Sequence, residues 1–174
     1  MQLKDDAMLI ARLIKTVGGK LVGRIRLQKT MYILQAAGLD SNLVYQYYHY
    51  GPYCEELADA ADYGAASGFF KEEEVNTSWG TAYSVYTANS KASDVDALPE
   101  AFIQLAQKAA DSSSVVLELA ATALYLSKEE GVVDVWSETV VRKPQKAKDG
   151  RIEMAKELYG ELRSLCPQLP AIGG

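Results

Sequence analysis

One pair of residues in the chain could form a nucleophile and its base. His49 is the only histidine, and Cys54, one of two cysteines, follows it five residues later. A cysteine thiolate beside a histidine is a common catalytic pair. Here Glu55 and Glu56 follow the cysteine directly, and neighbouring carboxylates raise the pKa of a thiol rather than lower it. The sequence therefore favours Cys54 as a small apolar residue over Cys54 as a nucleophile.

Other catalytic and cofactor patterns are incomplete. His49, Cys54 and Cys166 supply too few ligands for a structural zinc site. Residues 18–20, Gly-Gly-Lys, lack the rest of a phosphate-binding loop, and no nucleophile elbow or metalloprotease motif is present. The acidic runs are consecutive in sequence, which does not bring their carboxylates together over a substrate. We expect a chain without enzymatic activity, metal or cofactor.

Tyrosines are concentrated in one short segment of the sequence. Five tyrosines lie within nine residues: Tyr45, Tyr47, Tyr48, Tyr50 and Tyr53. Tyrosine is favoured at protein interfaces because it brings a large rigid surface and a hydroxyl group. It also stacks on nucleic-acid bases. The alternative is a strand whose rings pack between helices. The segment is a candidate partner-binding surface if the tyrosines contact a protein or nucleic-acid bases. It is not one if the rings pack between helices.

The acidic residues beside the tyrosines separate two kinds of partner. Glu55, Glu56, Asp59 and Asp62 follow the cluster, and no Lys or Arg lies between residues 29 and 71. Carboxylates placed among DNA phosphates oppose the main attractive term in DNA binding. A solvated helix face or a surface for a basic protein fits this charge better. We expect Glu55, Glu56 and Asp59 to bind another protein, such as a toxin or nuclease.

Cations near the N-terminus support the alternative, a nucleic-acid-binding regulator of winged-helix type. Arg24, Arg26 and Lys29 could bind phosphate at the start of a helix. The sequence favours a solvated helix face, with their aliphatic stems covering apolar neighbours. The sequence leaves both interpretations open.

Hydrophobic periodicity indicates which elements position these residues. Residues 43–50 are predicted to be extended, and Gly51-Pro52 to start a helix with Pro52 at its first position. Residues 69–88 are predicted to form a hairpin that turns at Ser78-Trp79-Gly80, followed by a polar linker over residues 89–97. The remaining predicted helices cover residues 3–17, 25–34, 98–110, 113–128, 132–142 and 150–166.

This order of elements predicts a mainly α fold with a small β-hairpin. Three helices followed by a two-stranded wing are typical of a winged-helix-like part, here residues 1–90. Residues 91–174 are predicted to form a helical-bundle extension packed on it, within one compact domain. With 48% hydrophobic residues among 174, the chain can bury a core without disulfide bonds.

Composition also predicts the compartment. The two cysteines lie far apart in sequence, as expected in a reducing environment. No apolar run approaches the length of a membrane span, and the first residues lack the basic-then-apolar order of a signal peptide. These features predict a cytoplasmic protein that does not bind membranes.

Two segments resemble a known family. Residues 26–34, Arg-Leu-Gln-Lys-Thr-Met-Tyr-Ile-Leu, resemble the "LQK-hydrophobic-hydrophobic-Tyr" helix of YwgA-like bacterial proteins. Residues 50–57, Tyr-Gly-Pro-Tyr-Cys-Glu-Glu-Leu, are similar to the "YGP-[YF]-S-x-E-L" segment of the same proteins. Cys54 stands where a serine is usual. The same signature occurs in the broader Panacea group, which includes SocA-like antitoxins and proteolytic adaptors.

The resemblance covers about the first third of the chain and implies a small helical domain without known enzymatic activity. For Panacea members it implies antitoxins that neutralise unrelated toxins. The motif residues are Arg26, Gln28, Lys29, Gly51 and Pro52, and they can be structural or binding. In the structural interpretation, Gln28 and Lys29 lie opposite the core face of their helix, and Gln28 bonds the backbone of the turn at Tyr50-Gly51.

Overall fold

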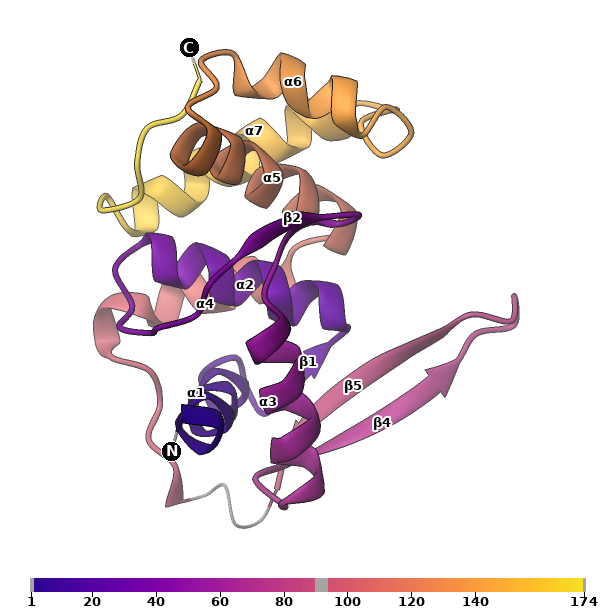
Figure 1. Cartoon of the computed structure of the whole chain (residues 1–174), viewed down its shortest axis with the longest axis vertical. Coiled ribbons are helices and arrows are strands. Elements are labelled where there is room, and N and C mark those ends of the chain that lie inside the picture. The colour runs from indigo at the N-terminus through magenta and orange to yellow at the C-terminus, as the bar shows by residue number, and fades with distance from the viewer. Residues whose placement is uncertain (1, 90–93, 174) are drawn as a thin grey trace.

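The computed structural model describes residues 2–89 and 94–173, so residues 90–93 of the predicted linker lie outside the described part. The described part is mainly helical with a small antiparallel sheet, as predicted (Figure 1). Its helices are α1 (Gln2–Thr16), α2 (Arg24–Ala36), α3 (Glu55–Ala66), α4 (Glu100–Asp111), α5 (Ser114–Glu130), α6 (Val135–Arg142) and α7 (Arg151–Leu165). Its strands are β1 (Lys20–Val22), β2 (Gln46–Tyr48), β3 (Gly51–Tyr53), β4 (Phe70–Asn76) and β5 (Ala82–Ala88).

Three strands form an antiparallel sheet in the order β1-β5-β4. Leu21 of β1 lies opposite Tyr86 of β5, and Glu73 of β4 lies opposite Val85 of β5. The β4–β5 hairpin projects away from the helices (Figure 1). The hairpin predicted over residues 69–88 is therefore confirmed, and β1 lies between the predicted helices 3–17 and 25–34, where the sequence predicted no strand.

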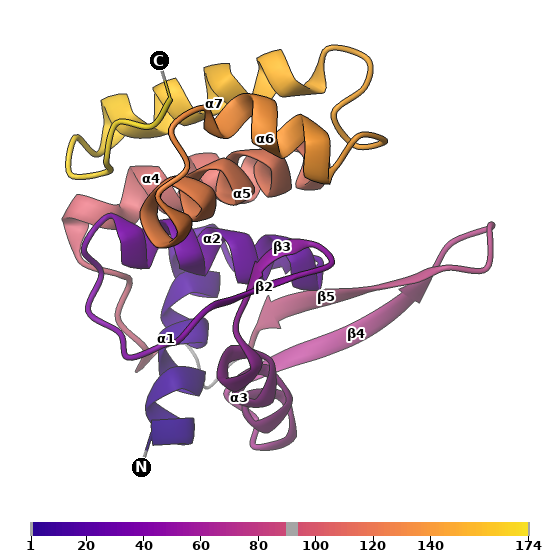
Figure 2. The same cartoon turned by 45° about the horizontal axis from the view of Figure 1, so that its top comes forward.

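Helices α2 and α5 lie at the centre of the molecule. In Figure 2, α6 and α7 lie on one side of α5 and α2 lies on the other. Every residue of α2 from Leu27 to Leu34 is buried, and so is every residue of α5 from Val116 to Leu124. A helix buried on all sides is ordinarily apolar all round. Gln28 and Lys29 of α2 and Glu118 of α5 are buried charged or amide side chains that need partners, and those partners define the site below.

The chain after residue 50 differs from the prediction. Gly51–Tyr53 forms strand β3, which pairs with β2, whereas the sequence predicted that Pro52 opens a helix. Helix α3 begins only at Glu55, after an extended Cys54. The physical reason is tertiary, because side chains of α2 hydrogen-bond the backbone at Pro52 and Cys54 and hold it extended.

The C-terminal helices agree with the predicted ranges to within a few residues. Trp136 of α6 is buried. Among the residues described, none of the helices combines the length and apolar character that a membrane-spanning segment requires.

Candidate functional site

The candidate site is built around the β2–β3 hairpin, which we call the tyrosine hairpin (residues 45–53). Its strands have three residues each, with Tyr47 opposite Pro52 and Tyr48 opposite Gly51. A two-stranded hairpin this short is not stable alone in water. Its geometry must therefore come from the rest of the protein.

Two buried side chains of α2 hold strand β3. Gln28 donates from Nε2 to the Cys54 carbonyl at 2.9 Å, and its Oε1 accepts from the Cys54 amide at 2.8 Å. The Nζ of Lys29 donates to the Pro52 carbonyl at 2.7 Å. Gln28 thus bonds the returning chain at Cys54, not at the Tyr50-Gly51 turn as the sequence suggested. The side chain of Lys29 reaches inward, not outward.

This placement corrects the interpretation of the N-terminal cations as one surface group. Lys29 is only 1% exposed, so it belongs neither to a phosphate-binding patch nor to a solvated helix face. Arg26 donates to the Ser112 carbonyl at 3.0 Å and to the Val22 carbonyl at 3.1 Å. Of the three, only Arg24 has an exposed side chain, and it forms an ion pair with Glu72 at 2.9 Å.

Gly51 allows the hairpin to lie against α5. Its φ of +87° is in the region that glycine adopts readily. A Cβ at this position would also collide with Oγ1 of Thr122 on α5. Both constraints exclude a side chain here, so Gly51 has a structural role in the site.

The hairpin tyrosines divide into an inner and an outer group. Tyr45 packs edge-on against Tyr32 with ring centroids 4.8 Å apart, and burial raises its pKa well above the ordinary value. Tyr47 is half-buried between the ring of Tyr125, at 5.9 Å, and the guanidinium of Arg142, at 5.1 Å. These two rings pack between elements, as the structural interpretation of the cluster expects.

The outer group faces solvent. The side chains of Tyr48 and Tyr50 are 53% and 51% exposed. Tyr53 is half-buried, and its ring lies 5.2 Å from that of Tyr48. Tyr50 has the Nζ of Lys146 over its ring at 4.4 Å. The outer rings are therefore held in place by neighbours while much of their surface remains accessible.

Helix α3 continues this surface with carboxylates. Glu55, Glu56 and Asp59 are all exposed, and within the described residues none of them forms an ion pair within 4.0 Å. Glu55 and Asp59 lie near Tyr53, where burial first and then Glu55 raise the pKa of the phenol. The outer tyrosines and the carboxylates of α3 thus form one aromatic and acidic surface.

The thiol of Cys54 has no catalytic environment. Its side chain is fully buried, and burial, with Glu56 at 3.4 Å from Sγ, raises its pKa to about 11. A thiol that stays protonated at neutral pH and is closed to solvent is a poor nucleophile. In residues 2–89 and 94–173, no three His, Cys, Asp or Glu side chains are grouped so that they could share a metal ion.

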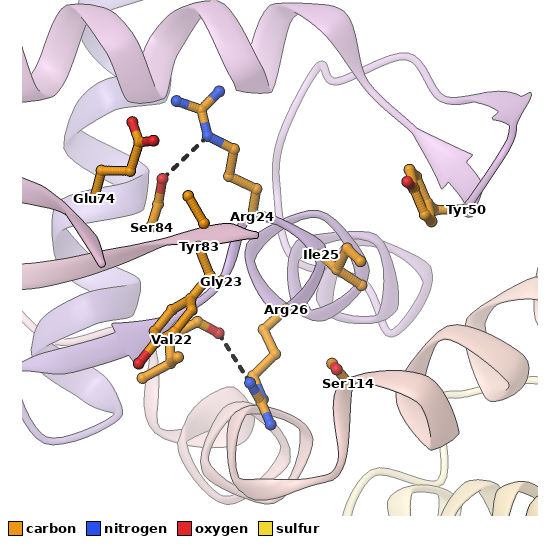
Figure 3. A pocket seen from close by; sticks show the side chains of 11 residues that line it. Val22, Gly23, Arg24, Ile25, Arg26, Tyr50, Glu74, Tyr83, Ser84 and Ser114 are labelled. Carbon is orange, nitrogen blue, oxygen red and sulfur yellow. Dashed lines mark hydrogen bonds between the residues drawn. The ribbon is translucent and has the colours of Figure 1, made fainter. Parts of the chain in front are cut away.

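A cavity of about 700 Å³ lies between the tyrosine hairpin and the β4–β5 hairpin (Figure 3). Tyr50 lines one side, and Tyr83 and Glu74 line the other. Arg24 and Arg26 also line the cavity, and their guanidinium groups are already bonded, Arg24 to Ser84 at 3.2 Å and Arg26 to backbone carbonyls. The cavity therefore offers aromatic and apolar walls rather than free positive charge.

Three further residues under the hairpin were missed by the sequence interpretation. Glu118 of α5 is 1% exposed and pairs with Lys143 at 3.0 Å and Lys146 at 2.7 Å. Glu118 was the available signal, because it is the only charged residue in the apolar run 115–124. A buried carboxylate requires a partner, although the sequence of the chain does not show which cations pair with it.

No family model matches this chain, and no curated protein matches it closely enough to count as a relative. The resemblance of residues 26–34 and 50–57 to YwgA-like and Panacea proteins therefore stays a prediction from those two motifs.

Proposed function

We propose that this chain is a non-enzymatic protein-binding module, antitoxin-like or adaptor-like, of a bacterial cytoplasmic system. Its partner docks on the aromatic and acidic surface made by the tyrosine hairpin and α3. The antitoxin or adaptor role follows from the resemblance to YwgA-like and Panacea proteins. The location of the docking surface follows from exposure and charge.

The observation that carries the proposal is the exposure of Tyr48 and Tyr50 on a fixed backbone. About half of each side chain is accessible, while Gln28, Lys29 and Gly51 hold the strands beneath them. Aromatic side chains that are already ordered lose little conformational entropy when a partner covers them. Such rings commonly supply much of the affinity of a protein interface.

Charge favours a basic protein as the partner. Glu55, Glu56 and Asp59 lie beside the outer rings, and in the described part of the chain no cation pairs with them within 4.0 Å. Complementary charge speeds association and excludes acidic competitors. A lysine or arginine of the partner could also lie over a tyrosine ring, as Lys146 does within this chain.

The order α1-β1-α2-α3-β4-β5, with the hairpin β2–β3 inserted between α2 and α3, and the sheet order β1-β5-β4 support a winged-helix-like N-terminal part. In this arrangement β4–β5 is the wing and α4–α7 is a helical extension. This arrangement favours the alternative function, a nucleic-acid-binding regulator. Helix α3 opposes it, because the helix that would enter the DNA groove exposes Glu55, Glu56, Asp59 and Asp62.

The test is a pull-down from the native host with three baits. The wild type is compared with a triple variant, Glu55→Gln with Glu56→Gln and Asp59→Asn, and with Tyr48→Ser combined with Tyr50→Ser. We expect both variants to weaken one shared complex. The triple variant should weaken it most strongly at low salt, because the attraction that it removes is electrostatic. Glu55 and Glu56 also favour the N-terminus of α3, so stability falls by roughly 0.3–1 kcal/mol for each.

A matched control removes the same number of exposed carboxylates elsewhere, through Glu100→Gln, Asp111→Asn and Glu157→Gln. An identical partner set from the wild type, the control and the triple variant would remove α3 from the proposed surface. Sequence-specific DNA binding by the wild type with a Kd below about 1 µM, tighter than ordinary non-specific binding, would favour the alternative instead.

A further inference from the structure

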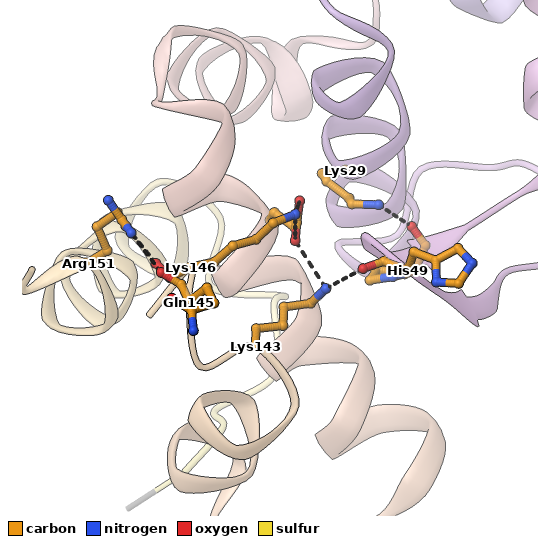
Figure 4. A network of polar contacts seen from close by, with 8 residues as sticks. Lys29, His49, Lys143, Gln145, Lys146 and Arg151 are labelled. Carbon is orange, nitrogen blue, oxygen red and sulfur yellow. Dashed lines mark hydrogen bonds and ion pairs between the residues drawn. The ribbon is translucent and has the colours of Figure 1, made fainter. Parts of the chain in front are cut away.

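Four charged side chains from three segments meet beneath the tip of the tyrosine hairpin (Figure 4). Glu118 of α5 accepts from Lys146 at 2.8 and 2.7 Å and pairs with Lys143 at 3.0 Å. Both lysines follow α6, and Lys29 approaches from α2. Lys29, Lys143 and Glu118 are all at most 6% exposed. The cluster is therefore sheltered from water on most sides.

Two of these lysines hold the turn of the hairpin. The Nζ of Lys143 donates to the His49 carbonyl at 2.9 Å, and the Nζ of Lys29 donates to the Pro52 carbonyl at 2.7 Å (Figure 4). These carbonyls lie on either side of Tyr50 and Gly51. The turn that presents Tyr50 is thus fixed by two amines, one from each half of the chain.

The cluster has more positive than negative groups. Glu118 pairs with Lys143 and Lys146, whereas Lys29 has a backbone carbonyl as its partner and no carboxylate within 4.0 Å among the described residues. A charged Lys29 would place a third ammonium beside one carboxylate, away from water. Burial lowers the pKa of Lys29 to about 7; Glu118 opposes this shift, and Lys143 and Lys146 add to it.

We propose that Lys29 is a proton-operated latch of the tyrosine hairpin, which holds the turn closed when its amine is neutral and favours release when it is charged. A neutral amine can still donate one hydrogen bond to the Pro52 carbonyl and adds no charge to the cluster. A charged amine gains hydration only if the turn opens. The latch rests on the proposed function in one respect, because it would regulate that surface.

The direction of the pH dependence follows from proton counting. In the open form Lys29 is hydrated and regains the ordinary lysine pKa of about 10.4, so the open form binds more protons than the closed form between about pH 7 and 10. Opening therefore increases as the pH falls toward 7 and levels off below it. For one such proton, the opening constant rises roughly twentyfold from pH 8.5 to pH 6.5.

Other titratable groups face the same region and need controls. Glu118 faces Lys29 from α5, and Lys143 and Lys146 face it from the segment after α6. Burial also lowers the pKa of Lys143, which acts in the same direction. His49 belongs to the hairpin itself, with its ring pointing away from the lysine amines (Figure 4). Because His49 is part of the hairpin, it is replaced by Gln in the experiment.

Cys54 reports opening, because its thiol is buried directly after β3. In a His49→Gln, Cys166→Ala background it is the only cysteine. Its rate of labelling by a thiol reagent is measured from pH 6.5 to 8.5 and divided by the rate of the urea-unfolded chain at each pH. We expect this ratio to rise roughly twentyfold toward pH 6.5 with Lys29, and to vary less than about threefold with Lys29→Met.

Two results would overturn the latch. One is a labelling ratio that does not change with pH, or that changes with pH by the same slope in Lys29→Met as in the chain that keeps Lys29. The other is a ratio equal to the global unfolding constant from urea titration at every pH, because the hairpin would then not open separately. If Lys29→Met fails to fold, the lysine side chains of the wild type are titrated by NMR. One amine titrating near pH 7 is expected, and titration of all of them above pH 9 contradicts the proposal.

The labelling experiment needs no partner protein, so the two proposals fail separately. If a partner binds the outer tyrosines but Cys54 labelling does not depend on pH, the latch alone is contradicted. A pH-dependent latch in a chain that captures no partner through this surface contradicts the proposed function alone.

Discussion

The two β-hairpins in the described part of this protein are held by different means. Strands β4 and β5 form seven residue pairs, β5 also pairs with β1, and the turn is closed by Thr77, whose Oγ1 donates to the Thr81 carbonyl at 3.1 Å. Strands β2 and β3 form three pairs and depend on Gln28, Lys29 and Lys143. The long hairpin carries its stability in its own ladder, whereas the short one takes its shape from helices far away in sequence.

The difference also appears in the aromatic residues at the two tips. Trp79, at the tip of β4–β5, is 85% exposed. Tyr50, at the tip of β2–β3, is 51% exposed and lies beneath Lys146. A side chain without neighbours samples many conformations, whereas a ring with fixed neighbours is ordered before a partner arrives. This is why we place the partner on the tyrosine hairpin and not on the tip of the longer one.

Glu118→Gln is the substitution that tests the anchoring of the short hairpin most severely. It removes the carboxylate that pairs with Lys143 and Lys146 and leaves buried cations uncompensated. Loss of one partner of a buried ion pair costs about 3–5 kcal/mol. Urea unfolding at pH 8 measures it, with the exposed Glu129→Gln on the same helix as control. A loss below about 1 kcal/mol, the range of surface pairs, would show that the cluster does not anchor the hairpin.

Gln28→Ala removes the side chain that bonds both the amide and the carbonyl of Cys54. Leaving buried groups without partners costs about 1–3 kcal/mol. The free energy of unfolding should fall by that amount, whereas Gln104→Ala, at an exposed position of α4, should leave it nearly unchanged. An unaltered denaturation midpoint for Gln28→Ala would contradict the structural role of this motif and favour a binding role.

Trp79→Ala should have the smallest effect. The exposed ring contributes little to the folded state, so the expected change in unfolding free energy is within about 0.5 kcal/mol. Thermal or urea unfolding measures it. A loss above about 1 kcal/mol would mean that the tip of β4–β5 is anchored after all, and the contrast between the two hairpins would not hold.

The sequence by itself determined the elements whose signals are local. Apolar residues at helical spacing marked the helices of both halves, and alternating residues around Ser78-Trp79-Gly80 marked the β4–β5 hairpin. It also indicated that Gln28 bonds the backbone of the returning chain, although it placed the bond at the Tyr50-Gly51 turn and the bonds are at Cys54. Each of these features depends on neighbouring residues in the chain or on one short motif.

Only the tertiary structure decided how the tyrosine hairpin is held. Gly51-Pro52 has the local signature of a helix start, yet hydrogen bonds from α2 make it a strand. Lys29 has the signature of a surface residue, yet its aliphatic stem carries the amine inward to the Pro52 carbonyl. Lys143 bonds His49 across 94 residues of sequence. Local propensities of most residues other than proline differ by less than about 1 kcal/mol, so buried contacts between distant segments override them.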